Sequence, residues 1–290
     1  MPISKKPRKK QRSQPKVTDT LPDSRGMEGL MTNLSNRRSR EDSLQVAQGI
    51  MYQAWDESNR KKRVALARKA LQESPLCADA YVLLAQEDAE SIDDVLVYYE
   101  RGVEAGEQAL GPEGFAEYAG HFWGFLETRP YMRARAGLAA LLWQTGRQQE
   151  AIDHYQAMLE LNPNDNQGIR YELAGWLLAR HDVKALKQLI RRYEDDNGTA
   201  WLYTRVLLAF RENDPDAEML AEQAWLANSH VPGVLAGTEP LVGSMNGYIT
   251  LGGADEAGEY VRDNGGAWSA TAGAVGWLME RAKQMTMRPR

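Results

Sequence analysis

The sequence contains a single cysteine, Cys77, among its 290 residues. An internal disulfide framework is therefore excluded, and such sparse use of cysteine is typical of a reducing compartment. No run of eighteen apolar residues is present, so we expect no membrane-spanning helix. The first residues are polar and basic, so we expect no secretory signal. These absences predict a cytoplasmic protein, or a nuclear one in an organism that has a nucleus.

The sequence also lacks any recognisable arrangement of catalytic or metal-binding residues. Its four histidines lie far apart, and none has the spacing of a zinc-binding helix such as HExxH. We expect His121, beside Trp123, to be a packed side chain rather than a catalyst. Cys77 is expected to be a small buried hydrophobe at a helix junction. We therefore expect no enzyme activity, no metal and no cofactor.

What the sequence does contain is a repeated helical pattern, clearest in Met132–Asp165. Leu138 and Leu142 belong to an apolar stripe with helical spacing. Gly146 can end that helix because glycine accepts a positive φ, and Pro163 cannot continue the helix that follows. These positions and the length of 34 residues are typical of one tetratricopeptide repeat.

The same frame recurs on both sides of this unit. We expect about five units, two before an irregular segment at residues 109–131 (a loop around a short helix) and three after it. Such units cannot bury their apolar faces alone, so they stack into a solenoid. The predicted fold is all-α: a disordered basic tail (1–40), a tetratricopeptide-type repeat solenoid of helical hairpins (41–253, interrupted at 109–131) and a C-terminal helical cap (254–290).

The C-terminal cap is predicted from a break in the period. Beyond His230, prolines and glycines indicate a crossing loop. Two final helices are then expected at Ala254–Asn264 and Thr271–Gln284, with Trp268 and Trp277 holding them on the last repeat. A terminal cap with a polar outer face keeps the end of a solenoid soluble.

Charge is distributed unevenly along the chain. Residues 1–40 carry eleven Lys/Arg and three Asp/Glu, a net charge of +8, whereas the remainder carries twenty-four and thirty-seven, a net charge of −13. The tail is a solubilising arm, a nucleic-acid contact or a nuclear address. Its candidate polyanion-binding residues are Lys5, Lys6, Arg8, Lys9, Lys10 and Arg12.

Several segments resemble a known family. They are Ala54-Trp55, Ala70–Ala85 (ALQESPLCADAYVLLA), Ala105–Glu107, Asn228–Pro232, Gly120–Gly124 (GHFWG), Glu127–Arg133 (ETRPYMR) and Asn162–Tyr171 (NPNDNQGIRY). In this order they are similar to the suppression-of-tumorigenicity-seven family, and most of all to its short soluble bacterial relatives. The resemblance implies a repeat-type helical protein without an established catalytic activity. The animal members are similar to membrane proteins with N-terminal spans, and this chain has a basic tail instead.

The candidate binding surface combines arginine with aromatic residues. First helices of such repeats line the concave face, and Arg133 and Arg170 fall at positions that commonly point into it. Two guanidinium groups there could grip a carboxylate or phosphate, and neighbouring tyrosines would add contact area. Alternatively, these arginines pair with nearby carboxylates of the chain itself. The candidate partner-binding residues are Arg129, Tyr131, Arg133, Arg170, Tyr171 and Tyr203.

Together these features predict a non-catalytic scaffold or adaptor that holds a protein or peptide segment in its concave face. The alternative is a nucleic-acid- or ribosome-associated protein tethered by its basic tail. The sequence leaves the partner and the oligomeric state open.

Nucleic-acid binding through the tail makes a specific prediction. The full chain should bind a polyanion with an affinity that falls steeply as salt rises, because paired cations release condensed counterions. A chain lacking residues 1–40 should lose this binding. Binding isotherms for both chains across a salt series measure the difference, and equal affinities or a flat salt response would contradict it.

Overall fold

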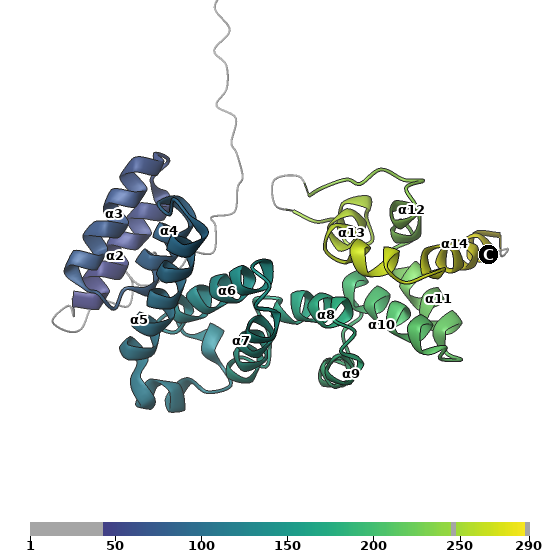
Figure 1. The fold of residues 1–290 in the computed structure, drawn as a ribbon, viewed down its shortest axis with the longest axis horizontal. Helices are drawn as coiled ribbons and strands as arrows, with labels where there is room; N and C mark the ends of the chain where they lie inside the picture. Colours follow the sequence, from purple (N-terminus) through teal and green to yellow (C-terminus); the bar gives the residue numbers. More distant parts are fainter. Residues whose placement is uncertain (1–42, 245–247, 288–290) are drawn as a thin grey trace, which may run out of the picture.

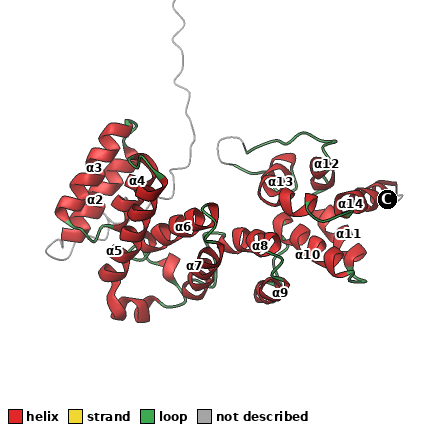
Figure 2. Cartoon of the chain, in the orientation of Figure 1, coloured by secondary structure: helices red, strands yellow, loops and turns green. Residues whose placement is uncertain are grey.

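A computed structural model describes residues 43–244 and 248–287. The basic tail and its candidate polyanion-binding residues lie outside this described part. Throughout the described ranges the chain is helical and contains no β-strand (Figure 2). None of the helices there has an apolar stretch long enough to cross a bilayer. The predicted all-α fold class is confirmed.

Most of the helices form successive pairs that follow one another along the long axis of the molecule (Figure 1). Within the described residues there are five such pairs, two before the irregular segment and three after it. The pairs are α2 (Ser43–Asp56) with α3 (Arg60–Glu73), α4 (Ala78–Glu87) with α5 (Ile92–Tyr118), α6 (Arg129–Gln144) with α7 (Gln148–Leu161), α8 (Ile169–Ala179) with α9 (Val183–Arg192), and α10 (Thr199–Glu212) with α11 (Ala217–Ala227).

The pair α6/α7 shows why the sequence folds this way. Leu138 and Leu142 on α6 are buried, as are Tyr155 and Met158 on α7. Gly146 joins the two helices with a φ of 86°, in the left-handed region that glycine enters without a Cβ clash. Burying these two apolar stripes against each other, and then against the neighbouring pairs, supplies most of the stability of such helices.

Helices α5 and α6 approach each other closely through glycine. A Cβ atom added at Gly106 of α5 would lie 2.8 Å from Cβ and 3.0 Å from Cα of Tyr131 on α6. One turn earlier, a Cβ at Gly102 would lie 3.1 Å from Cβ of Ala134. The two backbones therefore touch along a seam that only small residues permit.

The irregular segment is more helical than the sequence predicts. Helix α5 changes direction at Gly111, where φ is 58°, and then continues to Tyr118. A short 3₁₀-helix, η1 (Phe122–Gly124), follows before α6. Phe115 packs on Phe122 and on Tyr131, with ring centroids 5.2 Å apart in both cases. These aromatic contacts hold the segment against the stack.

The C-terminal helices take two different places. They are α12 (Val231–Leu235), α13 (Ala254–Ser269) and α14 (Ala274–Met287). Helix α14 packs against α11 and ends the stack, in the place predicted for a cap. Helix α13 instead packs on α8 and α10, the first helices of the last two pairs. It runs past Asn264, its predicted end, because Trp268 is fully buried and donates a hydrogen bond to the Tyr260 hydroxyl at 2.8 Å.

The close approach of α5 and α6 at glycine predicts that alanine substitutions at Gly106 and at Gly49 change the stability of the fold in opposite directions. Gly106→Ala should destabilise the fold by about 1–3 kcal/mol, because the new Cβ overlaps the backbone of Tyr131, which cannot rotate away. The matched control is Gly49→Ala in α2, where an added Cβ meets nothing within 4 Å. There the helix propensity of alanine should stabilise by up to about 1 kcal/mol. Urea unfolding midpoints measure both, and equal shifts would contradict the seam.

Candidate functional site

Arg133, predicted to face a partner, is held in a buried ion pair with Asp79. The Nε and Nη2 atoms of Arg133 on α6 each donate to a carboxylate oxygen of Asp79 on α4 at 2.7 Å. Only 9% of the arginine side chain and none of the aspartate is exposed. The guanidinium group also lies over the ring of Trp55 on α2, 5.2 Å from its centroid. The expected bidentate grip exists, but the carboxylate belongs to the chain itself.

The surroundings of Asp79 complete this internal network. Gln48 Nε2 donates to Asp79 Oδ2 at 2.8 Å. Cys77 is buried nearby, as predicted for a small hydrophobe at a helix junction. Burial and the charge of Asp79 raise the pKa of the Cys77 thiol to about 12. The thiol therefore stays protonated at neutral pH, and a protonated thiol is a poor nucleophile.

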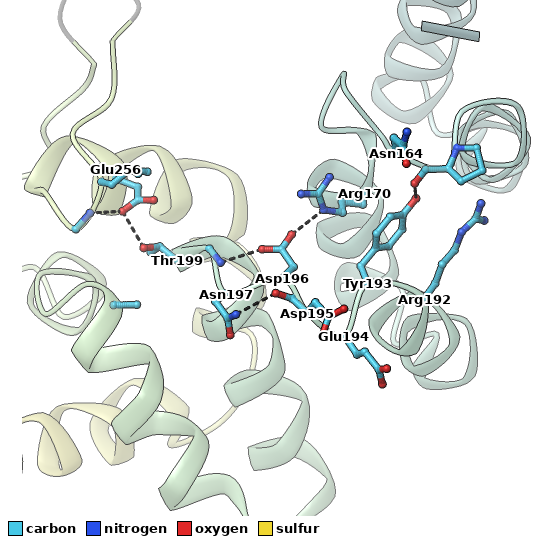
Figure 3. Close-up of a pocket in the computed structure, with 15 residues that line it drawn as sticks. Asn164, Arg170, Arg192, Tyr193, Glu194, Asp195, Asp196, Asn197, Thr199 and Glu256 are labelled. Carbon is cyan, nitrogen blue, oxygen red and sulfur yellow. Dashed lines mark hydrogen bonds and ion pairs between the residues drawn. The ribbon is translucent and has the colours of Figure 1, made fainter. Parts of the chain in front are cut away.

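Arg170 occupies a second internal network, of which Figure 3 shows the contact with Asp196. Its Nε donates to Asp196 Oδ2 at 2.7 Å and its Nη1 to Asp165 Oδ2 at 2.9 Å. Its guanidinium group lies 4.3 Å from the ring centroid of Tyr171 and 5.2 Å from that of Tyr193. Both carboxylates and both rings come from the chain, so this arginine too is already paired.

The two aspartates around Arg170 have further roles. Asp165 accepts hydrogen bonds from the backbone N–H groups of Ile169 and Arg170 at 2.8 and 2.9 Å, so it caps the first turn of α8. Burial by itself raises the pKa of the Asp196 carboxyl. Hydrogen bonds from the Gly198 N–H, Arg170 and Tyr171 outweigh that effect, and the pKa lies below its ordinary value. Asp196 therefore remains a charged partner of Arg170 at neutral pH.

The other predicted site residues are scattered through the stack. Tyr131 and Tyr203 are buried, and the Tyr203 hydroxyl donates to the Asn228 carbonyl at 2.7 Å. Arg129 donates to the Trp123 carbonyl at 2.9 Å. The prediction of an open groove face is therefore wrong for Tyr131, Arg133 and Tyr203, because their side chains lie in the core. Tyr171 is half-buried beside Arg170.

The prediction for His121 is also wrong. The residue is exposed rather than packed, because it lies just before η1, at the edge of the irregular segment. Across the described ranges, no group of three or more His, Cys, Asp or Glu side chains is close enough to hold a metal ion.

The open surface that remains includes a cleft of about 710 Å³ between α8 and α13, here called the α8–α13 cleft. It exists because α13 lies over the first helices of the last two pairs without filling the space beside α6. Among the described residues that line it, none is Lys, Arg or His. Its aromatic and acidic residues are Trp143, Tyr171, Trp176, Tyr260, Glu172, Glu256, Glu259 and Asp263.

Two aromatic residues of the cleft wall, Trp143 and Trp176, belong to a ring stack contributed by three helices. Trp143 of α6 and Trp176 of α8 lie nearly parallel with ring centroids 4.8 Å apart, and Tyr155 of α7 stacks on Trp176 at 4.3 Å. The stack joins the third pair to the fourth. Trp143 and Trp176 are half-buried, so they serve both as packing residues and as part of the cleft wall.

The carboxylates of the cleft differ in how they are held. Glu256 accepts hydrogen bonds from Thr199 Oγ1 at 2.8 Å and from the Gly252 N–H at 2.7 Å. Burial and the charge of Glu259 raise the pKa of the Asp263 carboxyl above its ordinary value. Glu259 is paired with Arg262, so the cleft brings the other carboxylates, those of Glu172, Glu256 and Asp263, close to aromatic rings.

A more open hollow of about 910 Å³ adjoins this cleft and shares Thr199 and Glu256 with it. Figure 3 shows that Arg170 and Asp196 line it, together with Arg192 and Asp195. Its arginines are held by the chain, since Arg192 donates to the Leu159 carbonyl at 2.6 Å. We therefore regard it as the rim of the α8–α13 cleft.

A separate space of about 470 Å³, here called the N-terminal cleft, lies between α2 and the end of α5. Apolar side chains such as Leu44, Leu76 and Leu110 line it, together with Glu113, Glu117 and Glu127. Again, no basic residue occurs among the described residues of its lining. The sequence patterns singled out neither cleft, although the net charge of −13 outside the tail was a signal of acidic surfaces.

An all-helical stack of paired helices with open clefts along it is the architecture of a helical repeat protein. Comparison with known proteins identifies a more specific similarity. The sequence model of the ST7 protein family matches residues 37–171. The resemblance drawn from the sequence is confirmed: over residues 37–171 the chain is similar to the ST7 family.

Curated relatives agree with this family. A protein called suppressor of tumorigenicity 7 protein-like from Rattus norvegicus is 27% identical over 231 residues, which cover 69% of this chain and 40% of the relative. The protein of this name from Homo sapiens is 27% identical over 183 residues, which cover 59% of this chain and 31% of the relative. The protein of the same name from Gallus gallus is 41% identical over 66 residues, which cover 23% of this chain and 12% of the relative. The chain thus spans 40% or less of these relatives. Its predicted closeness to short bacterial members stays a prediction.

The buried ion pair predicts a large stability effect. Asp79→Ala should destabilise the fold by about 3–5 kcal/mol, because it leaves the Arg133 guanidinium buried without its partner. The matched control is Glu150→Ala, which removes an exposed ion pair with Arg147 and should change stability little. Chemical unfolding of both variants measures this. Similar small shifts in the two would show that Arg133 finds water or another partner.

Proposed function

We propose that this chain is a non-catalytic protein-binding scaffold, and that its α8–α13 cleft receives a basic segment of a partner protein. The observation that carries the proposal is the lining of this cleft, in which aromatic rings and carboxylates occur together without a described basic side chain. The charge of the expected ligand is therefore opposite to the one that the arginines suggested from sequence.

The chemistry of lysine and arginine suits such a lining. Their apolar stems can lie against Trp143 and Trp176, and their cationic heads can reach carboxylates such as Glu172 and Asp263. A cation bound beside Asp263 would oppose the effects of burial and of Glu259, which raise the pKa of that carboxyl. Attraction between an acidic cleft and a basic peptide would also favour correct partners and fast association.

The fold supports binding of a chain segment rather than a reaction. The cleft lies where first helices of repeat pairs face a common groove, the surface that such proteins use for recognition. The thiol of Cys77 is buried and protonated, and the described ionisable groups of the cleft are carboxylates and the Tyr171 and Tyr260 hydroxyls. These groups can bind a cation, but they do not form a nucleophile–base pair.

Polyanion binding is a second candidate function, favoured by the net charge of +8 in residues 1–40. The acidic clefts would repel phosphate groups, so any nucleic acid would have to contact the tail. Deletion of the tail separates the two functions, because the α8–α13 cleft would keep its basic peptide while polyanion binding would be lost.

Selection from a random peptide library on the immobilised full chain tests the proposed function. We expect enriched peptides that carry Lys or Arg next to apolar residues. Asp263→Lys should weaken these peptides roughly tenfold, because it replaces attraction by repulsion in a partly desolvated cleft. The control is Glu160→Lys on the exposed surface of α7, which should leave affinity unchanged. Enrichment of acidic peptides, or equal effects of both variants, would refute the proposal.

A further inference from the structure

The N-terminal cleft joins an apolar floor to an acidic edge at the point where the described chain begins. Leu44, Gln45 and Gln48, all in the first turns of α2, line the cleft. The described chain therefore begins at the edge of this cleft, directly after residue 42. The acidic edge includes Glu113 and Glu117, exposed and one turn apart on the last part of α5.

The sequence just before α2 has the chemistry that complements this cleft. Met27, Leu30, Met31 and Leu34 follow one another with the i, i+3, i+4, i+7 spacing that gathers apolar residues on one helical face. Arg37, Arg38 and Arg40 come next. The segment thus offers an apolar stripe followed by three cations, opposite a cleft with an apolar floor and an acidic edge.

We propose that residues 27–40 dock in the N-terminal cleft of the same chain. The apolar residues would occupy the floor beside Leu44 and Leu110, and the arginines would pair with Glu113 and Glu117. This proposal concerns a different cleft from the proposed function and does not depend on it.

The reach of the chain allows this docking. Leu34 is nine residues before Ser43, and an extended chain of that length spans about 30 Å. A tether this short makes the segment locally concentrated, so modest contacts are enough to hold it. The proposed docking leaves the more distal cluster Lys5–Arg12 outside the cleft, where it remains available for other contacts.

The cleft would then be occupied by its own chain, and an external basic peptide would have to displace residues 27–40. This distinguishes it from the α8–α13 cleft, because the described residues that line that cleft, from Trp143 onward, are far from residue 43 in the sequence. The chain would therefore present one self-covered acidic cleft and one open to partners.

Photo-crosslinking of the full chain tests the docking. With p-benzoylphenylalanine in place of Leu30, we expect cross-links within one chain to the first turns of α2 or to residues 110–127. The double variant Glu113→Lys, Glu117→Lys should lower their yield about fivefold, since two attractive contacts become repulsive. Adding Arg37→Glu and Arg38→Glu should restore it by reversing the opposite partners. The control pair Glu160→Lys, Glu280→Lys changes the net charge equally on exposed positions of α7 and α14 and should leave the yield unchanged.

Three outcomes would overturn the proposal. Products of twice the chain mass would assign the cleft to a second copy instead. Cross-links spread over the body would remove the specific site. An equal loss of yield in the control pair would show that net charge, rather than the cleft, attracts the segment. Circular dichroism and thermal unfolding confirm that each charge variant is folded, because all four glutamates are exposed.

Discussion

Arg133 and Arg170 are held inside the stack by aspartates that lie beside them in space but come from other segments of the chain. The chemistry of the open surfaces follows from this pairing. A guanidinium group largely removed from water needs carboxylate partners, because an unpaired buried charge costs several kcal/mol. Asp79 meets that need for Arg133, and Asp165 with Asp196 meets it for Arg170. Once these arginines are paired internally, the linings of the two clefts contain carboxylates and no described Lys, Arg or His, and among these carboxylates Glu259 is paired with Arg262 from outside the lining.

The position of α13 determines where the acidic surface is open. In a plain array of paired helices the first helices would share one continuous groove. Here α13 covers α8 and α10, so the groove is reduced to a cleft beside α6 and the aromatic stack of Trp143, Tyr155 and Trp176. The ST7 family match, residues 37–171, includes the first three pairs and the N-terminal cleft but ends as α8 begins. The α8–α13 cleft is therefore formed mostly beyond the matched segment.

The elements that local patterns could predict are those whose apolar stripes lie within one helix pair. Leu138, Leu142 and Gly146 marked α6 and its end correctly, because their spacing records burial against the immediately following helix. A short helix was expected within residues 109–131, but neither the continuation of α5 to Tyr118 nor the extension of α13 past Asn264 was predicted. Both involve aromatic residues whose packing the helical period does not record: Phe115 packs on Phe122 and Tyr131, and Trp268 is fully buried and donates to the Tyr260 hydroxyl.

The sequence by itself determined the all-α class, the paired arrangement of the helices, the burial of Cys77 and the acidic charge of the body, because each depends on composition or on contacts within about 34 residues. Only the tertiary structure decided whether Arg133 and Arg170 face a ligand or the core. Asp79 lies 54 residues before Arg133, and Asp196 lies 26 residues after Arg170. Such pairings arise from the way separate helix pairs stack, and no periodicity within a single repeat records them.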